Sequence, residues 1–152
     1  MKLTARTDVE APQARVFDRL AHIPTLEDLA RARGAELSRI DDGARGPAGA
    51  AWRLRVPMGG RLRAATARVT TFDPADRIAV SADLDGVEAW LDLVLAPLSP
   101  ERTALRTDLE LRPRTMAGRL LVQPLKLART RLEERLRDRV DAIARRIEAD
   151  AA

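Results

Sequence analysis

The stretch RTMAGRLLVQPLKLARTRLEERLRDRVDAIARRIEA, residues 114 to 149, decides how the rest of the chain must be arranged. Apolar side chains recur in it at steps of three and four residues, the spacing that places them on one side of an α-helix. A helical stripe of this length needs a broad surface to cover, and the candidate surface is a run of strands earlier in the chain. The stripe consists of Leu125, Ala128, Leu132, Leu136, Val140, Ile143 and Ile147.

Pro124 divides this long helix. A proline inside a helix removes one backbone hydrogen bond and clashes with the carbonyl four residues back, so we expect a kink or a break there. The piece from Thr115 to Gln123 is predicted to be a movable segment, which we call the lid. The piece from Leu125 to Ala149 is predicted to be a rigid brace. The apolar residues of the lid are Met116, Leu120 and Leu121.

The central part of the chain, residues 35 to 113, reads as strands separated by turns. Asp85-Gly86 is the strongest hairpin signal, because both central positions of a type I′ turn require positive φ. Connections this short favour an antiparallel sheet, since parallel neighbours need a crossover of a dozen residues or more. The expected strands are Ala35 to Ile40, Ala51 to Met58, Arg61 to Phe72, Arg77 to Leu84, Val87 to Ala96 and Thr103 to Arg112.

The amino-terminal part adds one strand and two helices. Lys2 to Glu10 alternates between apolar and polar residues, which is typical of a half-buried strand, and it most simply completes an edge of the sheet. The first helix is expected from Pro12 to about His22, with Pro24 marking its end. The second is expected from Thr25 to Arg33, with Thr25 as a candidate N-cap.

The order of elements predicts an α+β fold. One strand, two helices, six strands and a long helix would form a curved, seven-stranded antiparallel sheet wrapped around the C-terminal helix. The length of 152 residues suits one domain, residues 1 to 152.

Composition narrows the chemistry. The chain has no cysteine and a single histidine, His22, so disulfides and thiolate nucleophiles are excluded, and a histidine-based metal site is not expected. No cofactor is predicted. The sequence shows neither an apolar run of membrane-spanning length nor a secretory leader, so a cytoplasmic location is the expectation.

Charge concentrates in the terminal helix, where residues 114 to 152 carry ten basic and six acidic side chains. Nucleic acid is not the expected partner, because single-strand binders need aromatic stacking platforms and this chain has only two tryptophans and two phenylalanines. A weak contact between the basic C-terminal helix and an anionic membrane surface stays open. The oligomeric state is left undetermined.

Two local patterns carry a family resemblance. Residues 8 to 21, DVEAPQARVFDRLA, place a small-Pro step before a Val-Phe pair, and residues 95 to 105 form a late hairpin that begins Leu-Ala-Pro. Together with the element order, they resemble the helix-grip fold of the START-like, or SRPBCC, superfamily over nearly the whole chain. One departure is the sequence Ile23-Pro24-Thr25-Leu26, where the family commonly has a tryptophan.

The resemblance implies a cavity between sheet and helix that holds a lipid, sterol, quinone, polyketide or other apolar molecule. Its predicted lining combines inward strand positions with the lid, and a core packed shut against the helix is the alternative. If Gly59-Gly60 forms a two-residue loop, Met58 pairs with Arg61, and Arg61 and Arg63 flank the mouth; a three-residue loop would bury Arg68 instead. We prefer the first register, because it buries no charge. The predicted ligand-binding residues are Trp52, Leu54, Val56, Ala67, Val69, Leu91, Leu93, Thr107, Leu109, Met116, Leu120 and Leu121.

The sequence favours binding over catalysis, because the carboxylates of the strands point outward and so could not act as acids or bases in the cavity. Trp90 points outward as well. We therefore predict a protein that binds or carries a hydrophobic small molecule or lipid without chemistry. The alternative is an enzyme of the polyketide cyclase or aromatase type that uses Thr107, a rim arginine or His22. No catalytic residue is assigned. The outward carboxylates are Asp83, Glu88, Asp92, Asp108 and Glu110.

Overall fold

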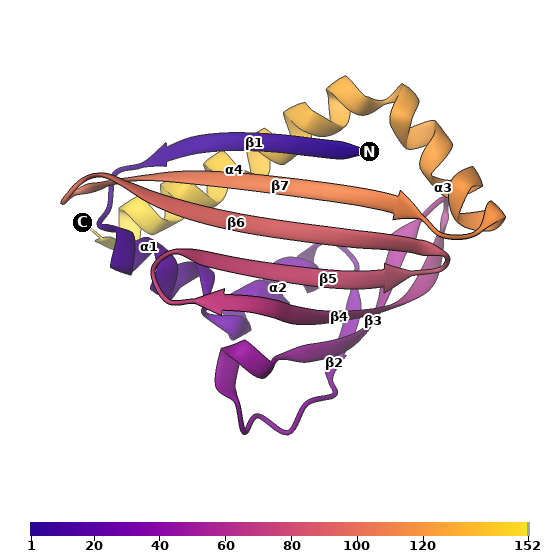
Figure 1. Ribbon diagram of the computed structural model, residues 1–152, viewed down its shortest axis with the longest axis horizontal. Helices are drawn as coiled ribbons and strands as arrows, with labels where there is room; N and C mark the ends of the chain where they lie inside the picture. Colours follow the sequence, from indigo (N-terminus) through magenta and orange to yellow (C-terminus); the bar gives the residue numbers. More distant parts are fainter. Residues whose placement is uncertain (152) are drawn as a thin grey trace.

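The structure is a computed structural model that describes residues 1 to 151, and it contains a seven-stranded antiparallel sheet in the order β1-β7-β6-β5-β4-β3-β2 (Figure 1). The predicted α+β class and strand count are confirmed. The strands are β1 (Lys2–Val9), β2 (Glu36–Arg39), β3 (Ala51–Met58), β4 (Arg61–Asp73), β5 (Arg77–Leu84), β6 (Val87–Ser99) and β7 (Arg102–Pro113). The helices are α1 (Gln13–Leu20), α2 (Ile23–Ala32), α3 (Met116–Leu127) and α4 (Arg129–Ala151), with a 3-10 turn at Gly46–Gly49.

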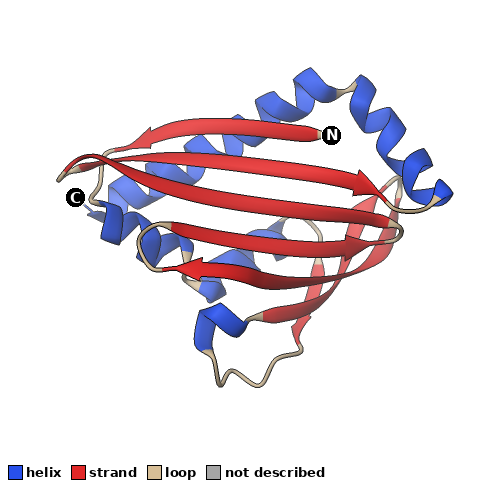
Figure 2. Cartoon of the chain, in the orientation of Figure 1, coloured by secondary structure: helices blue, strands red, loops and turns tan. Residues whose placement is uncertain are grey.

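The helices α1, α2 and α4 lie on one face of the sheet, which we call the inner face (Figure 2). Among the helices, α4 packs chiefly along β1, at one edge of the sheet. Helix α3 instead packs against β6 and β7 and stands at the end of the sheet. The long C-terminal element therefore braces one edge and one end of the sheet, and it does not cover the whole inner face.

The hairpin turns fix the register as predicted. Gly59 and Gly60 have φ values of 63° and 83°, and Met58 pairs with Arg61 across them. The two-residue loop is therefore correct, and Arg68 stays on the outer face. The Asp85-Gly86 turn likewise has positive φ at both positions, 49° and 87°, which is the type I′ geometry.

The hydrophobic core gathers where α1 and the second half of α4 meet the sheet. Phe17 of α1 contacts Phe72 of β4 edge to face, with 5.2 Å between the ring centroids, an arrangement that aromatic pairs favour. Val140 and Ile147 of α4 are buried in the same cluster. The strand residues of this core are Ala5, Val9, Ile78, Leu95 and Leu105.

The boundary between α1 and α2 differs from the prediction. Pro24 does not end the first helix; it lies in the first turn of α2, where its missing N–H is not needed. The N-cap of α2 is His22 and not Thr25, and the imidazole Nδ1 of His22 lies 2.8 Å from the hydroxyl of Thr25. Pro24, which we expected to end the first helix, instead marks the beginning of α2.

The break in the C-terminal helix also lies later than predicted. Helix α3 continues through Pro124 and ends at Leu127, and Ala128 separates it from α4. Pro124 denies a hydrogen bond to the carbonyl of Leu120, but Leu120 is exposed and water can take that place. The bend appears only after the helix has added one more turn, so the lid predicted for residues 115 to 123 is shorter than the actual helix.

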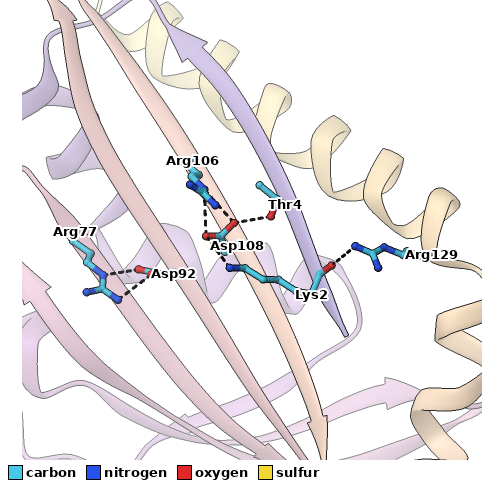
Figure 3. A network of polar contacts seen from close by, with 7 residues as sticks. All are labelled: Lys2, Thr4, Arg77, Asp92, Arg106, Asp108 and Arg129. Carbon is cyan, nitrogen blue, oxygen red and sulfur yellow. Dashed lines mark hydrogen bonds and ion pairs between the residues drawn. The ribbon is translucent and has the colours of Figure 1, made fainter.

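The outer face of the sheet carries cross-strand ion pairs (Figure 3). Arg77 of β5 forms two hydrogen bonds to Asp92 of β6, 2.7 and 2.9 Å long. Asp108 of β7 accepts a 2.8 Å hydrogen bond from Thr4 and pairs with Arg106 at 3.3 Å. This face is charged. It holds all of the carboxylates predicted to point outward: Asp83, Glu88, Asp92, Asp108 and Glu110.

Candidate functional site

The inner face brings together the predicted lining residues that lie on strands. Strand pairing places Trp52 opposite Ala67 and Leu91 opposite Leu109. Thr107 lies between Ala5 and Leu93. Because directly paired residues point to the same side of a sheet, these positions share the face that the helices approach. The strand residues brought together are Trp52, Leu54, Val56, Ala67, Val69, Leu91, Leu93, Thr107 and Leu109.

This inner face has two halves that differ in burial. In the half beside α1 and α4, which we call the closed half, the core residues of the strands are at most 4% exposed. In the half toward the β3–β4 and β5–β6 turns, several apolar residues of the same phase remain partly exposed, whereas Ala65 and Val87 are buried. We call this the open half, because the helices cover it only in part. Its members are Leu54, Val56, Ala67, Leu84, Leu91 and Leu109.

The lid residues differ from their predicted orientation. Met116 and Leu120 point to the outside of α3 and are 70% and 65% exposed, whereas Leu121 is partly buried. The inner side of α3 is formed by Gly118 and Val122. The sequence suggested Gly118 only as a flexible residue of the lid and gave no role to Val122. The four-residue spacing of Gly118 and Val122 is consistent with one side of a helix. Because α3 carries apolar residues on both sides, however, the sequence did not show which side faces the sheet.

Close backbone contact sets the orientation of α3. A Cβ atom at Gly118 would overlap the carbonyl of Gly86 in the β5–β6 turn. The hydroxyl of Thr115 caps the helix by accepting a 2.9 Å hydrogen bond from the amide of Gly118, and the amide of Arg114 donates to the carbonyl of Gly86. Only glycine permits this approach, so the turn and the start of α3 form one rigid junction.

The predicted rim arginines lie on the β3–β4 hairpin, and the two have different surroundings. Arg63 is mostly buried and donates to the carbonyl of Met58 at 2.9 Å and to Asp85 at 2.7 Å. Its charge thus fastens this hairpin to the β5–β6 turn. Arg61 is exposed and has no ion pair among the described residues. Of the two, Arg61 is the cation available to an incoming group.

A polar cluster surrounds Trp52 where β2 and β3 border the open half. The indole N–H of Trp52 donates to the carboxylate of Glu27 on α2 at 2.9 Å. The guanidinium of Arg39 lies over the indole ring, 5.6 Å from its centroid, and pairs with Asp41 at 2.6 Å. The hydrogen bond from Arg39, followed by that from the amide of Ala51, holds the pKa of Asp41 below its usual range. Sequence reasoning missed Glu27, because only the path of α2 brings it to the sheet.

Thr107 is the polar anomaly of the inner face. It is 2% exposed, and its hydroxyl has no hydrogen-bond partner among the described residues. A buried polar group without a partner costs about 1–3 kcal/mol. Thr107 lies on the boundary between the closed and open halves, so a ligand that reached this depth would find a free donor and acceptor.

A small cleft lies between the helices. It has a volume of about 70 Å³ and opens between α1, α2 and α4. A 2.6 Å ion pair between Arg19 and Asp150 lies at its rim. Its apolar lining is Leu20, Leu26, Leu29, Ile143 and Ile147.

Groups for acid–base or metal chemistry are scarce in the described part of the chain. The inner strand positions of residues 1 to 151 include no Asp, Glu or His. Over the same residues, no three His, Cys, Asp or Glu side chains gather in a way that could hold a metal ion. No helix within this range combines the length and apolar character needed to cross a membrane.

The likeness to known proteins is structural. No protein-family model and no curated protein matches the chain. The Zhui aromatase/cyclase from Streptomyces sp. R1128 matches with a TM-score of 0.70 over 97% of this chain and 93% of that chain, at 18% identity. A norcoclaurine synthase from Thalictrum flavum, a point mutant with a bound transition-state analogue, matches with a TM-score of 0.69 over 100% of this chain and 96% of that chain, at 14% identity. A START superfamily protein from Mycobacterium smegmatis matches with a TM-score of 0.58 over 88% of this chain and 95% of that chain, at 16% identity. Sequence identities this low show a shared fold but not a shared activity, so the activity has to be argued from the residues of the site. The chain therefore shares the helix-grip fold of these proteins.

Proposed function

We propose that the protein binds and carries a hydrophobic small molecule or lipid on the open half of the inner face, without catalysing a reaction. The observation that carries this proposal is the partial exposure of apolar side chains on the helix-facing side of the sheet. Covering such surface contributes roughly 25 cal/mol for each Å² removed from water. An apolar ligand would supply the cover that the helices do not.

The polar groups near the open half suit recognition better than chemistry. The carboxylate of Glu27 already accepts from Trp52, and the guanidinium of Arg63 is bonded to Met58 and Asp85. Each is positioned by a partner within the protein. The hydroxyl of Thr107 is the free polar atom at the inner boundary, so one hydroxyl or carbonyl of the ligand can be placed against it.

The alternative function is a cyclase or aromatase that uses the same face. It is favoured by the reach of Glu27 onto the inner face, since a carboxylate there could move a proton, and by the shared fold with the Zhui aromatase/cyclase. A cyclase that closes an aromatic ring releases water. Native mass spectrometry of any co-purified molecule, before and after incubation with fresh protein, separates the two: an unchanged mass supports carriage, and a loss of one water supports the enzyme.

The two tryptophans allow a direct binding test. Trp52 lies on the inner face, and Trp90 lies on the outer face, as predicted. In a Trp90→Phe background, Trp52 is the sole fluorescent tryptophan. We expect the neutral dye N-phenyl-1-naphthylamine to quench Trp52 emission saturably, at one dye per chain. In the reciprocal Trp52→Phe protein, the emission of Trp90 should not change.

A matched pair of variants tests the location. Leu91→Ser, in the Trp90→Phe background, removes an apolar side chain from the open half and should weaken dye binding about tenfold. Leu98→Ser changes an exposed leucine near the opposite end of the same strand and should leave binding unchanged. Equal dye affinity in all of these proteins, or quenching of Trp90 as strong as that of Trp52, would contradict the proposed site.

A further inference from the structure

Helix α3 exposes an apolar ridge. Met116, Leu120 and Leu127 are 70%, 65% and 90% exposed. They lie at positions i, i+4 and i+11, which fall on one side of the helix, opposite the buried Gly118 and Val122. Single exposed leucines are ordinary, but three large apolar side chains aligned on one helix mark a contact surface. We call these three residues the α3 ridge.

Exposed cations flank the α3 ridge, and one acidic residue, Glu134, lines the surface hollow beside Leu127 and Arg131. Arg119 and Lys126 of α3 and Arg131 of α4 are exposed, and none forms an ion pair with a described residue. No Asp or Glu occurs between residues 114 and 132. Two other arginines of the region are neutralised, Arg114 by Glu88 and Arg129 by Glu133. The ridge therefore lies in a local field of positive charge.

The charge selects among the possible occupants of the ridge. A second copy of the chain, docked by two-fold symmetry, would place this basic surface against itself, and like charges brought together oppose association. An anionic surface with an apolar interior satisfies both features. Amphipathic helices with cations beside large apolar residues bind the boundary between lipid headgroups and acyl chains in this way.

We propose that α3 docks the protein on an anionic lipid membrane, with the α3 ridge inserted among the lipids and the flanking cations on the headgroups. The shape of the molecule permits it, because α3 stands beyond the ends of β6 and β7 as the outermost element at that end (Figures 1 and 2). The rigid junction with Gly86 holds the ridge outward. This inference does not rest on the proposed ligand binding, although it would bring the open half of the sheet close to the membrane.

Vesicle sedimentation tests the proposal with the full chain. Vesicles of equal parts phosphatidylcholine and phosphatidylserine should pellet the protein, whereas pure phosphatidylcholine should bind it at least about tenfold more weakly. Added salt should release the protein, because the flanking cations are exposed and screened. The double variant Leu120→Ser/Leu127→Ser should weaken binding to the mixed vesicles at least about tenfold. Arg119→Glu/Lys126→Glu should do the same.

Two matched controls separate this surface from general properties of the protein. Leu98→Ser removes an exposed leucine outside α3, and Arg145→Glu reverses an exposed cation of α4 far along the chain from the ridge; both should bind like the unaltered protein. Thermal unfolding should be unchanged by the ridge variant, since its side chains contact solvent. Equal binding to neutral and anionic vesicles, or equal loss in the controls, would overturn the proposal. So would a dimer in solution that the ridge variant converts to a monomer, since the ridge would then be an interface between copies.

Discussion

The closed and open halves of the inner face are built from the same strands with the same alternation, yet they differ in burial. Leu105 and Leu109 both lie on the inner side of β7, with Thr107 between them; Leu105 is 1% exposed, whereas Leu109 is partly exposed. The difference comes from the helices, because α1 and the second half of α4 cover one and not the other. An apolar strand pattern thus specifies which face of the sheet is to be covered, and the positions of the helices decide how much of that face the protein itself covers.

The largest expected effect separates the halves by stability. Leu105→Ala should lower the free energy of unfolding by about 2–5 kcal/mol, because it leaves a cavity in a packed core. Leu91→Ala, in the open half, should cost about 1 kcal/mol or less, since its side chain is already partly exposed. Urea unfolding of both variants measures this. Equal losses would show that the open half is as well packed as the closed half.

The junction of α3 tests what limits the open half. Gly118→Ala should destabilise the protein by about 1–3 kcal/mol, because the added methyl group has no room beside Gly86. It should also alter dye binding at the open half by displacing α3. Ala117→Ser, an exposed neighbour in the same helix turn, should change stability by less than about 0.5 kcal/mol. An unaffected Gly118→Ala protein would mean that α3 is not held against the turn.

Two threonines of β7 sharpen the comparison at the boundary. Thr103 is buried in the closed half and donates to the carbonyl of Ala11 at 2.8 Å, so Thr103→Val should cost about 1–3 kcal/mol. Thr107 has no partner, so Thr107→Val should stabilise by about 1 kcal/mol while weakening the binding of any ligand that uses the hydroxyl. Thermal unfolding of both variants measures the changes in stability. A loss of stability in Thr107→Val comparable to that in Thr103→Val would show that its hydroxyl is satisfied.

The smallest effect concerns acid sensitivity beside the open half. Hydrogen bonds from Arg39 and the backbone lower the folded-state pKa of Asp41. Its contribution to stability is therefore fully present above the unfolded pKa of about 4 and is lost as the pH falls through it toward the folded value. Asp41→Asn should be less stable than the parent at neutral pH, and the difference should shrink steadily as the pH falls below the unfolded pKa of about 4.

A double-mutant cycle checks the cause of this acid effect. Arg39→Gln alone should remove much of the same pH-dependent part, and adding it to Asp41→Asn should change little more, because the two residues act as a pair. Unfolding in urea at several pH values gives the numbers. Additive losses would mean that the Arg39–Asp41 pair is not the source.

Local chemistry made much of the fold predictable. Gly59-Gly60 and Asp85-Gly86 are residue types that accept positive φ, so both hairpins followed from the chain alone. The two-residue loop at Gly59-Gly60 was preferred over a three-residue loop because it buries no charge, and the structure settled that register. The alternation of Leu91, Leu93 and Leu95 with outward residues likewise placed the inner face. Pro24 misled, because the same residue suits a helix end and a helix start, and only the surrounding backbone distinguishes them.

The candidate site was predictable in part, for the same reason. Its strand residues were placed correctly on the inner face, but Met116 and Leu120 were assigned to the wrong side of α3. Glu27 was missed altogether, since nothing in its neighbourhood in the sequence indicates Trp52 as its partner. Such contacts join segments far apart in the chain.

The sequence by itself determined the strands, their turns and the apolar character of the inner face, because these depend on φ preferences and on a two-residue period. Only the tertiary structure decided which half of that face is closed, which side of α3 is exposed and which polar groups reach the sheet. These depend on where the helices cross the sheet, and close contacts such as that between Gly118 and Gly86 fix the crossing. No local pattern records a contact between residues 32 positions apart, which is the physical reason that the site had to be read from the fold.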